Sequence, residues 1–562
     1  MIRKEEGHGD HAAPCAQVLT NLGGCYFDMK DYEKAELYHT EALHMMEKSL
    51  GQNHADVAYC WHSLGCAYLE DSKESKGVSC LSKALKIQRE CLDKNHIDIG
   101  NTLYMLGRCL LSLKEIDRAI KSLIEALKIQ KVHLGDDYDV ALTHKCLATA
   151  QAKRGGRDEK AALSNFTEAI RILMAAGIQD SSESSSDLTA CFNGARALVR
   201  KIYGSNAEQL ASLLHRRGIC EGIRKNFSEA IASYAESLTI YKKIYGDRHI
   251  TIGNLLFNMG VCFNEGGEAE KAIKCLAKAH DLTCEKLEED HSDIADIDFQ
   301  MGTAYKLLED YTAAVKCYER SLLILKQISM ADNPKVASIM QDVGDICYSC
   351  NDIEKAERCY RECLRVRMNL EGRESASVAK TLAKLGALLR TKRDYAEALR
   401  CFEDSLVVRV QLSGKDTDEI ASSYFDLGSV HDLLNADKKA IFCYSESIRM
   451  YVALDDEPKL SVAKALSNKA AIVMSKEEDD DQRAMHIYQR ALDVRRACLG
   501  PTASERPAVD LADIIWGQAS IYDRMGKHDQ ALSYYEKCLA CYQESVGHES
   551  SQVARCIQSI SD

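Results

Sequence analysis

Residues 256–263 read Leu-Phe-Asn-Met-Gly-Val-Cys-Phe. Four of them recur at the i, i+3, i+4, i+7 spacing that predicts one face of an α-helix: Leu256, Met259, Gly260 and Phe263. The glycine belongs to a series with one constant spacing: Gly218, Gly260, Gly302, Gly344, Gly386 and Gly428, with Ala470 in the next place. A second series follows the first at a constant offset: Ala230, Ala272, Ala314, Ala356, Ala398 and Ala440. Two series in phase indicate a repeat, and a period of this length is typical of a stacked array.

Each repeat is predicted to be a pair of antiparallel helices. The stripe around Gly260 ends at Glu265-Gly-Gly-Glu268, and a second stripe through Ala272 ends before Gly302, where the pattern restarts. Glycine inside a helix costs about 1 kcal/mol relative to alanine, so its return requires a packing reason. We predict that the two helices cross at these glycines, which we call pivots: Gly23, Gly65, Gly107, Gly218, Gly260, Gly302, Gly344, Gly386 and Gly428. One long coiled coil is excluded because no heptad is sustained.

The residues around the pivots resemble the tetratricopeptide repeat (TPR). In the second repeat the matching residues are Trp61, Leu64, Gly65, Tyr68 and Ala84. The long period and links such as Leu50-Gly-Gln-Asn-His54-Ala-Asp-Val57 are similar to the kinesin light chain and nephrocystin-3 group. The proline that follows the histidine in that group is missing here. The resemblance implies an all-α solenoid of about twelve repeats in a right-handed superhelix, and protein binding without a particular partner.

The phase of the repeats divides the chain. Residues 1–175 hold repeats 1–4, and the step from Ala148 to Gly218 is much longer than the period. We expect an insertion at residues 176–205, made of a polar loop, Ser181 to Asp187, and an extra helix, Leu188 to Tyr203. Its serines, Ser181 to Ser186, are a candidate phosphorylation site. Residues 206–546 hold repeats 5–12 and residues 547–562 a capping segment. The chain is compatible with a fragment of a longer array, because His8 to His11 resembles the end of a link.

Composition argues for a protein partner. The net charge is −13, from 85 acidic and 72 basic residues, which opposes nucleic acid or an anionic membrane as the main partner. The sequence has no apolar run long enough to span a bilayer and no signal peptide, so we expect no membrane insertion and a cytoplasmic protein. The 24 cysteines fall mostly inside helical stripes, which indicates reduced, buried thiols.

No catalytic signature is found: no phosphate-binding glycine loop, nucleophile elbow or His-Glu-x-x-His. We therefore expect no enzyme activity, no cofactor and no metal. Two Cys-x-x-Cys pairs, Cys347/Cys350 and Cys538/Cys541, leave a thiol- or zinc-dependent redox regulator or enzyme as the alternative from another class. The pairs lack a second pair at finger spacing, which favours core thiols. The link histidines are one repeat apart and more typical of helix caps than of metal ligands: His54, His96, His249 and His291.

The first helix of each repeat carries the candidate partner-binding residues. Numbered from the pivot, positions −6, −3, +1 and +4 line the concave groove in the proteins that the chain resembles. Position −3 is aromatic or histidine in seven repeats: His62, Tyr104, His215, Phe257, Phe299, Phe425 and Trp516. Position −6 is polar, with both signs of charge: Asn254, Asp296, Ser338, Lys380 and Lys464 among others. We expect the rings to anchor a partner segment and the polar residues to hydrogen-bond to it. The alternative, that some rings pack on the neighbouring repeat, is left open.

These patterns predict an interaction scaffold or adaptor whose preformed groove binds a peptide or segment of a partner protein. A kinesin light chain-like cargo adaptor is an alternative, although we find no upstream heptad segment to join a motor. A groove that binds the tail of a chaperone is excluded. In the proteins that the chain resembles, that mode uses a lysine at −3 and an asparagine at +1 of one repeat. Here Lys145 is the only lysine at −3, and its +1 neighbour is Thr149. The partner's identity, the pathway and the oligomeric state are left open by the sequence.

Overall fold

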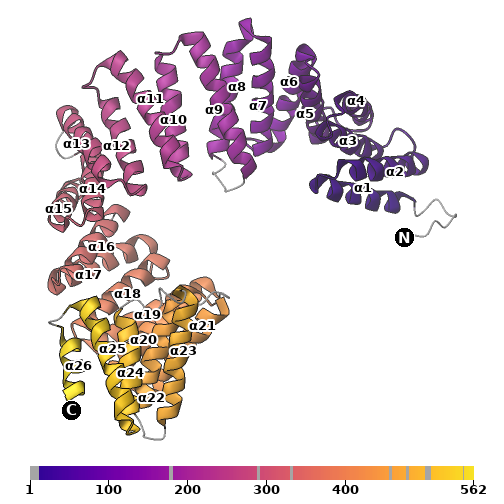
Figure 1. The fold of residues 1–562 in the computed structure, drawn as a ribbon. Helices are drawn as coiled ribbons and strands as arrows, with labels where there is room; N and C mark the ends of the chain where they lie inside the picture. Colours follow the sequence, from indigo (N-terminus) through magenta and orange to yellow (C-terminus); the bar gives the residue numbers. More distant parts are fainter. Residues whose placement is uncertain are drawn as a thin grey trace. The chain divides into compact units, whose positions relative to one another are not determined.

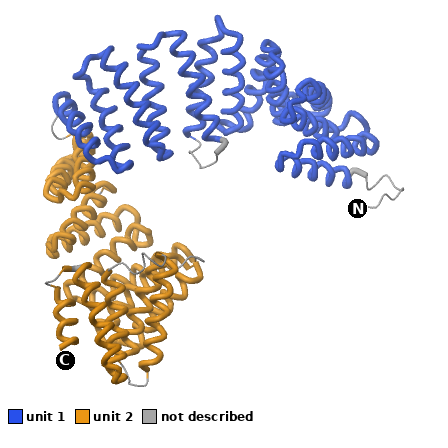
Figure 2. Tube along the Cα trace, viewed as in Figure 1, with its two compact units in different colours: residues 1–288 blue, residues 289–562 orange. Residues whose placement is uncertain are grey.

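The computed structural model describes residues 12–175, 182–287, 291–328, 333–414, 416–454, 459–475, 480–499, 508–547 and 550–561. Within these residues the regular elements are the α-helices α1–α26 and one short 3-10 helix, η1 (Gly156–Asp158), with no strand. The predicted all-α solenoid of paired helices is confirmed, whereas the handedness of a superhelix stays a prediction. The chain forms two compact units, residues 1–288 and 289–562 (Figure 2).

Unit 1 holds repeats 1–6 and one extra helix (Figure 1). The first helices are α1 (Ala12–Asp28), α3 (Ala55–Glu70), α5 (Ile97–Ser112), α7 (Tyr138–Arg154), α10 (Glu208–Ile223) and α12 (Ile250–Glu265). The second helices are α2 (Tyr32–Leu50), α4 (Glu74–Cys91), α6 (Ile116–Leu134), α8 (Glu159–Ala175), α11 (Phe227–Tyr245) and α13 (Ala269–Lys286). The extra helix, α9 (Ser182–Tyr203), follows repeat 4.

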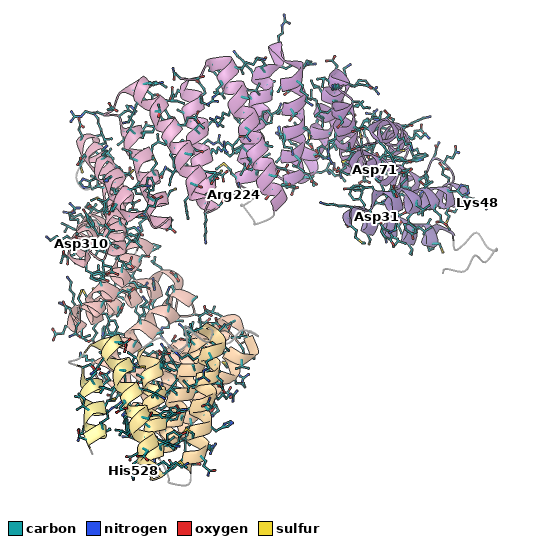
Figure 3. All side chains as sticks on the ribbon, viewed as in Figure 1. Asp31, Lys48, Asp71, Arg224, Asp310 and His528 are labelled. Carbon is teal, nitrogen blue, oxygen red and sulfur yellow. The ribbon has the colours of Figure 1, made fainter. Side chains whose placement is uncertain are left out.

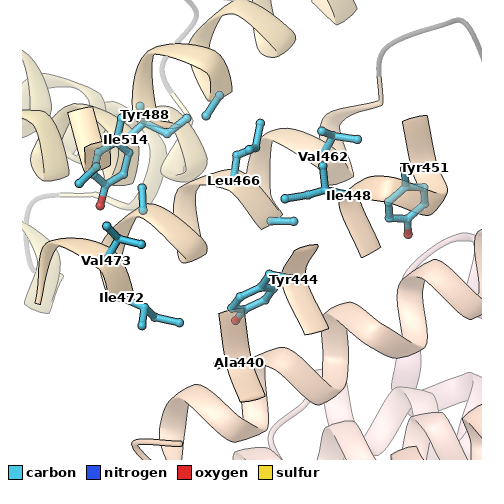
Figure 4. Packing of buried hydrophobic residues seen from close by; sticks show 14 of the residues in the cluster. Ala440, Tyr444, Ile448, Tyr451, Val462, Leu466, Ile472, Val473, Tyr488 and Ile514 are labelled. Carbon is cyan, nitrogen blue, oxygen red and sulfur yellow. The ribbon is translucent and has the colours of Figure 1, made fainter. Parts of the chain in front are cut away.

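Unit 2 holds repeats 7–12 and a last helix, α26 (Ser551–Ser561). The first helices are α14 (Ser292–Leu307), α16 (Pro334–Ser349), α18 (Ala376–Thr391), α20 (Asp418–Leu433), α22 (Leu460–Met474) and α24 (Val509–Arg524). The second helices are α15 (Tyr311–Gln327), α17 (Ile353–Glu371), α19 (Tyr395–Ser413), α21 (Asp437–Leu454), α23 (Asp481–Leu499) and α25 (His528–Val546). Figure 4 shows how their apolar faces meet, with Tyr444 on α21, Leu466 on α22 and Tyr488 on α23 in one buried cluster.

The pivots lie where the two helices of a repeat come closest. A Cβ added to any of the nine pivot glycines would lie 2.5–3.0 Å from one side chain of the second helix, always at the same offset along the chain. That side chain is large in every case: His39, Leu81, Leu123, Tyr234, Leu276, Tyr318, Tyr360, Phe402 and Tyr444. The glycine is therefore used as space for a ring or a branched side chain, which explains why it recurs in mid-helix.

Repeats 4 and 11 have alanine pivots and longer turns. In both, the large residue of the second helix lies two places later than in the other repeats and packs against a glycine of the following helix. A Cβ on Gly194 of α9 would meet the ring of Phe166, and one on Gly517 of α24 would meet the ring of Tyr488. In these two repeats the ring lies at the interface with the next helix.

The turn inside ten of the repeats shares one left-handed residue. The residue seven places after the pivot is left-handed, with φ between 54° and 67° at eight non-glycine residues: Lys30, Ser72, Lys114, Lys225, Glu309, Asn351, Arg393 and Asn435. Glycine takes this place at Gly267 and Gly526. In repeats 1, 7, 8 and 9 the next residue is an aspartate that caps the second helix; Asp31 accepts from Lys34 N at 3.2 Å and Asp310 from Ala313 N at 3.1 Å. Figure 3 labels Asp31 and Asp310.

Most links between repeats end on a capping side chain. The Nδ1 atoms of the four link histidines accept a hydrogen bond from the backbone N–H two residues later, at 3.2–3.3 Å: His54, His96, His249 and His291. Asn333, Ser375 and Thr417 cap the next first helices. The prediction that the histidines cap helices is confirmed.

The predicted loop from Ser181 to Asp187 is wrong for most of its length, because α9 already begins at Ser182. The reason is tertiary: Asp187 accepts from Tyr138 Oη at 2.7 Å and from Lys145 Nζ at 2.5 Å, both on α7. These bonds hold the first turns of α9 against repeat 4. Ser181 and the side chains of Ser182 and Glu183 lie outside the described residues, and phosphorylation of the serines stays a prediction.

Candidate interaction surface

The first helices form the closer-packed layer of each unit. Helices α1, α3, α5 and α7 each contact the next in that series, as do α10 and α12, α18 and α20, and α22 and α24. Among the described residues, consecutive second helices do not approach one another to this extent. At these pairs the array is therefore more tightly spaced on its first-helix side. We call this side the first-helix surface.

The seven rings at position −3 are all half-buried. The ring of Phe299 lies 5.9 Å from that of Tyr318, Phe425 lies 5.6 Å from Tyr444, and His215 lies 5.8 Å from Tyr234. Each of these tyrosines is the large residue that packs over a pivot glycine. In these three repeats the ring at −3 therefore rests on a buried tyrosine ring of its own repeat and stays half-buried itself.

Two of the rings are histidines that also bind the neighbouring first helix. His62 Nδ1 lies 2.9 Å from Thr102 Oγ1 on α5, and His215 Nε2 lies 3.0 Å from Asn258 Nδ2 on α12. Burial lowers the pKa of His62 to about 4 and lowers that of His215 as well. Both are neutral near pH 7, where they act as hydrogen-bonding links between repeats.

Tyr104 and Trp516 also contact residues outside their own helix pair. Tyr104 packs in the clusters between α5 and its neighbours, and burial raises the pKa of its hydroxyl. Trp516 lies under the Arg555 guanidinium, 4.1 Å from the ring centre, and its buried Nε1 has no hydrogen-bond partner among the described residues. Some rings at position −3 thus pack on the neighbouring repeat, which is the alternative that the sequence left open.

Position −6 is less uniform than its polarity suggested. Asn254, Lys380 and Lys464 are exposed. Asp296 instead accepts from Lys335 Nζ at 2.5 Å, and Ser338 Oγ donates to the Pro334 carbonyl of its own helix at 3.1 Å. The exposed amide and ammonium groups are the ones that a partner can reach directly.

Sequence reasoning missed a line of ion pairs at position −2. Lys306 binds Asp342 at 2.7 Å, Lys384 binds Asp345 at 2.5 Å, and Arg390 lies 3.6 Å from Asp426. The pairs join α14 to α16, α16 to α18 and α18 to α20. Burial raises the pKa of Asp426 to about 6, against the pull of Arg390. In the sequence, these ion pairs could have been recognised only from the charges at position −2. These charges alternate in sign from one repeat to the next, at Asp342, Lys384 and Asp426.

The thiols show no activated pair. Cys347 is buried in α16, whereas Cys350 is exposed at the end of that helix. Cys538 contacts Cys556 of α26, with 3.4 Å between the sulfur atoms, rather than Cys541. Burial raises the pKa of Cys347, Cys538 and Cys541, which disfavours the reactive thiolate. No cluster of residues that could hold a metal ion occurs in the part of the chain that the structure describes.

The described helices include none that could cross a bilayer. Pairs of antiparallel helices that recur along the chain define the class as a helical-repeat protein.

The sequence model of the tetratricopeptide repeat matches residues 14–76, 209–285, 293–369 and 377–451, more than half of the chain. Further models of the same repeat match residues 100–133 and 519–552. The chain belongs to the tetratricopeptide repeat family, whose fold is in general a non-catalytic scaffold for protein interactions.

Two solved structures are similar to parts of the chain. BtubC (BKLC) from P. vanneervenii is 24% identical over 41% of this chain and 92% of its own, with a TM-score of 0.36. The nearly identical TPR-like repeats of a Podosopora anserina protein assigned as a kinesin light chain are 13% identical over 37% of this chain and 98% of theirs, with a TM-score of 0.33. No curated protein sequence matches the chain.

Proposed function

We propose that this protein is a scaffold or adaptor that binds an extended or helical segment of a partner protein on its first-helix surface. The observation that carries the proposal is that half-buried rings recur at position −3 of the first helices, in unit 2 at Phe299, Phe425 and Trp516 of repeats 7, 10 and 12. Aromatic side chains that are partly accessible and held in place are the residues that most often dominate a protein interface.

The rings are held before any partner arrives. Phe299 rests on Tyr318, whose hydroxyl lies 3.3 Å from Thr303 Oγ1 and 3.4 Å from Asp342 Oδ2. In the next repeat Tyr360 donates to Asp345 at 2.7 Å. A surface whose side chains are already ordered loses little conformational entropy on binding, so a flexible partner segment bears most of the ordering cost.

The charges of this surface in unit 2 are largely satisfied by one another through the Lys306–Asp342, Lys384–Asp345 and Arg390–Asp426 pairs. Apolar contact with the rings then supplies most of the affinity. The exposed Lys380 and Lys464 set the orientation of the bound segment. We expect binding with only a weak dependence on salt.

The test uses peptides selected from a displayed library of random sequences against the whole chain. Their affinity is measured by fluorescence anisotropy for the parent, for the double variant Phe299→Ala with Phe425→Ala, and for Val407→Ala, an exposed apolar residue on a second helix. We expect at least a 10-fold loss in the double variant and no change in Val407→Ala. Peptides that bind the double variant as tightly as the parent would refute the proposed surface.

Phe257 belongs to unit 1 and Phe299 to unit 2. Their spacing of one repeat predicts that the two rings are neighbours on one wall of the groove, and this stays a prediction, as does the alternative of a kinesin light chain-like cargo adaptor. The variants above are therefore placed within unit 2.

A further inference from the structure

The series of first helices in unit 1 is interrupted between repeats 4 and 5 by the extra helix. Helix α9 lies between α8 and α10 and also contacts α7 (Figure 1). Among the described residues, α10 approaches neither α7 nor α8 to the extent that α10 and α12 approach each other. The repeat that begins with α10 therefore has no preceding first helix in close contact.

The residue at position −2 elsewhere binds the preceding first helix. It does so in repeats 6, 8, 9 and 10, through the contacts Asn258–His215, Asp342–Lys306, Lys384–Asp345 and Asp426–Arg390. In repeat 5 this residue is Arg216, which is half-buried. No described residue forms a hydrogen bond or an ion pair with its guanidinium. Arg216 thus places a charge at a binding position without the partner that other repeats supply.

Arg216 lines a cavity of about 450 Å³, which we call the α9 cavity. Helix α8 contributes Leu163 and Thr167, α9 contributes Val199, and α10 contributes Glu208, Gln209, Ser212, Leu213 and Arg216. Val199 and Leu213 are buried, and Leu163 is half-buried. The volume lies in the range of ligand pockets, roughly 300–1,000 Å³, in which a few polar groups stand among apolar ones.

Two opposite charges stand at the ends of the α10 part of this lining. Glu208 and Arg216 are eight residues apart, about 12 Å along the helix axis, which is too far for an ion pair between them. Glu208 accepts a hydrogen bond from the Tyr245 hydroxyl, which raises the pKa of that hydroxyl. Tyrosine is a neutral donor, and no described cation pairs with Glu208. Both charges of the α9 cavity are therefore uncompensated.

An extended peptide segment has the spacing that matches these two charges. In a strand the side chains at i, i+2 and i+4 lie on one face, and i and i+4 are about 13 Å apart. A basic side chain at one end of such a face reaches Glu208 while an acidic one at the other end reaches Arg216. An aliphatic side chain between them meets Leu163, Val199 and Leu213.

We propose that the α9 cavity binds an extended segment of a partner protein with the pattern basic-x-aliphatic-x-acidic. The extra helix thereby supplies a recognition site with its own sequence preference, set by charge complementarity at both ends. The proposal rests on the proposed function, that this chain binds segments of other proteins. Its site lies in unit 1, however, so variants of the α9 cavity and of the unit 2 rings test the two proposals separately.

The probes are two fluorescein-labelled peptides that differ in one residue: Gly-Ser-Lys-Thr-Leu-Thr-Glu-Ser-Gly, and the same sequence with lysine in place of glutamate. We expect fluorescence anisotropy to show at least 5-fold tighter binding of the glutamate peptide to the whole chain. Arg216→Glu should reverse this preference, because the new carboxylate attracts the lysine and repels the glutamate. Lys225→Glu makes the same change of charge at an exposed residue just beyond the end of α10, and it should leave the preference unchanged.

A reversed preference cannot arise from unfolding, and Arg216→Glu should melt close to the parent because Arg216 has no ion pair to lose. Thr167→Trp is a second variant that keeps both charges and fills the cavity from α8. The Thr167 hydroxyl donates only to the Ser164 carbonyl of its own helix, at 2.8 Å, so its loss breaks no contact between helices. We expect this variant to bind the glutamate peptide at least 5-fold more weakly than the parent.

Three results would overturn the proposal: no saturable binding of either peptide to the parent, equal affinity of the two peptides, or a glutamate preference that survives Arg216→Glu. If one of these occurs while the selected peptides still lose affinity in the Phe299→Ala, Phe425→Ala variant, the proposed function stands and the α9 cavity has no part in it.

Discussion

The ring of Tyr318 fills the space above Gly302, where a Cβ would lie 2.7 Å from Cδ1 of the ring. Tyr318 is fully buried, and the ring of Phe299 rests on it with 5.9 Å between the ring centres. A glycine at the helix crossing, a tyrosine on the second helix and a phenylalanine on the first-helix surface thus form one column. The geometry of the candidate binding surface depends on the packing at the pivot beneath it.

Gly302→Leu should push the helices of repeat 7 apart, because Tyr318 has no room to move. We expect a loss of about 1–3 kcal/mol in the free energy of unfolding, as for overpacked cores, measured by thermal and urea denaturation. Gly24→Ala is the matched control: nothing lies within 4 Å of its Cβ position, so it should be neutral or stabilising by up to about 1 kcal/mol. A Gly302→Leu chain that melts like the parent would contradict the crossing.

Arg393→Gly should stabilise repeat 9. Arg393 is exposed and held at φ +67°, a region that costs a non-glycine residue roughly 1–2 kcal/mol. Glycine removes that cost but adds freedom to the unfolded chain, so we expect a net gain of about 0.5–1 kcal/mol. Lys392→Gly, one residue earlier in a right-handed conformation, should lose about as much. Equal effects of both variants on the urea midpoint would show that the turn is not strained.

His39 should make repeat 1 sensitive to acid. It is 3% exposed against Gly23, and burial lowers its pKa to about 4 from the ordinary 6.5. Because the unfolded chain binds the proton more readily, stability is present above pH 6.5 and is lost as the pH falls toward 4. We expect a loss of roughly 1–3 kcal/mol over that range. His39→Leu, which copies Leu81 and Leu123 of the next repeats, should reduce this loss, as followed by melting between pH 7 and 4.5. An identical pH dependence in both proteins would exclude His39 as its source.

The constant spacing of the pivot glycines and of the alanines that follow them was enough to predict the helix pairs. The reason is that a pivot and the large side chain that packs over it lie within one repeat. Features that join different repeats were not predictable in this way. The start of α9 at Ser182 depends on the bonds from Asp187 to Tyr138 and Lys145 of α7, whereas the serine-rich composition there is typical of a loop. The Lys384–Asp345 pair spans 39 residues, and its partners could be matched only once the first helices were known to lie side by side.

Phe299→Ala with Phe425→Ala should separate a binding surface from a core. Both rings are half-buried, so each truncation should cost well under the roughly 3–5 kcal/mol typical of a fully buried phenylalanine. Phe402→Ala supplies that reference within the same unit, because Phe402 is 0% exposed over Gly386. We expect the double variant to keep its helical circular dichroism and to melt close to the parent, while Phe402→Ala melts well below it. If the double variant loses as much stability as Phe402→Ala, the rings are core residues and are not available to bind a partner on the first-helix surface. If it keeps both its stability and its affinity for the selected peptides, the rings are accessible but bind nothing.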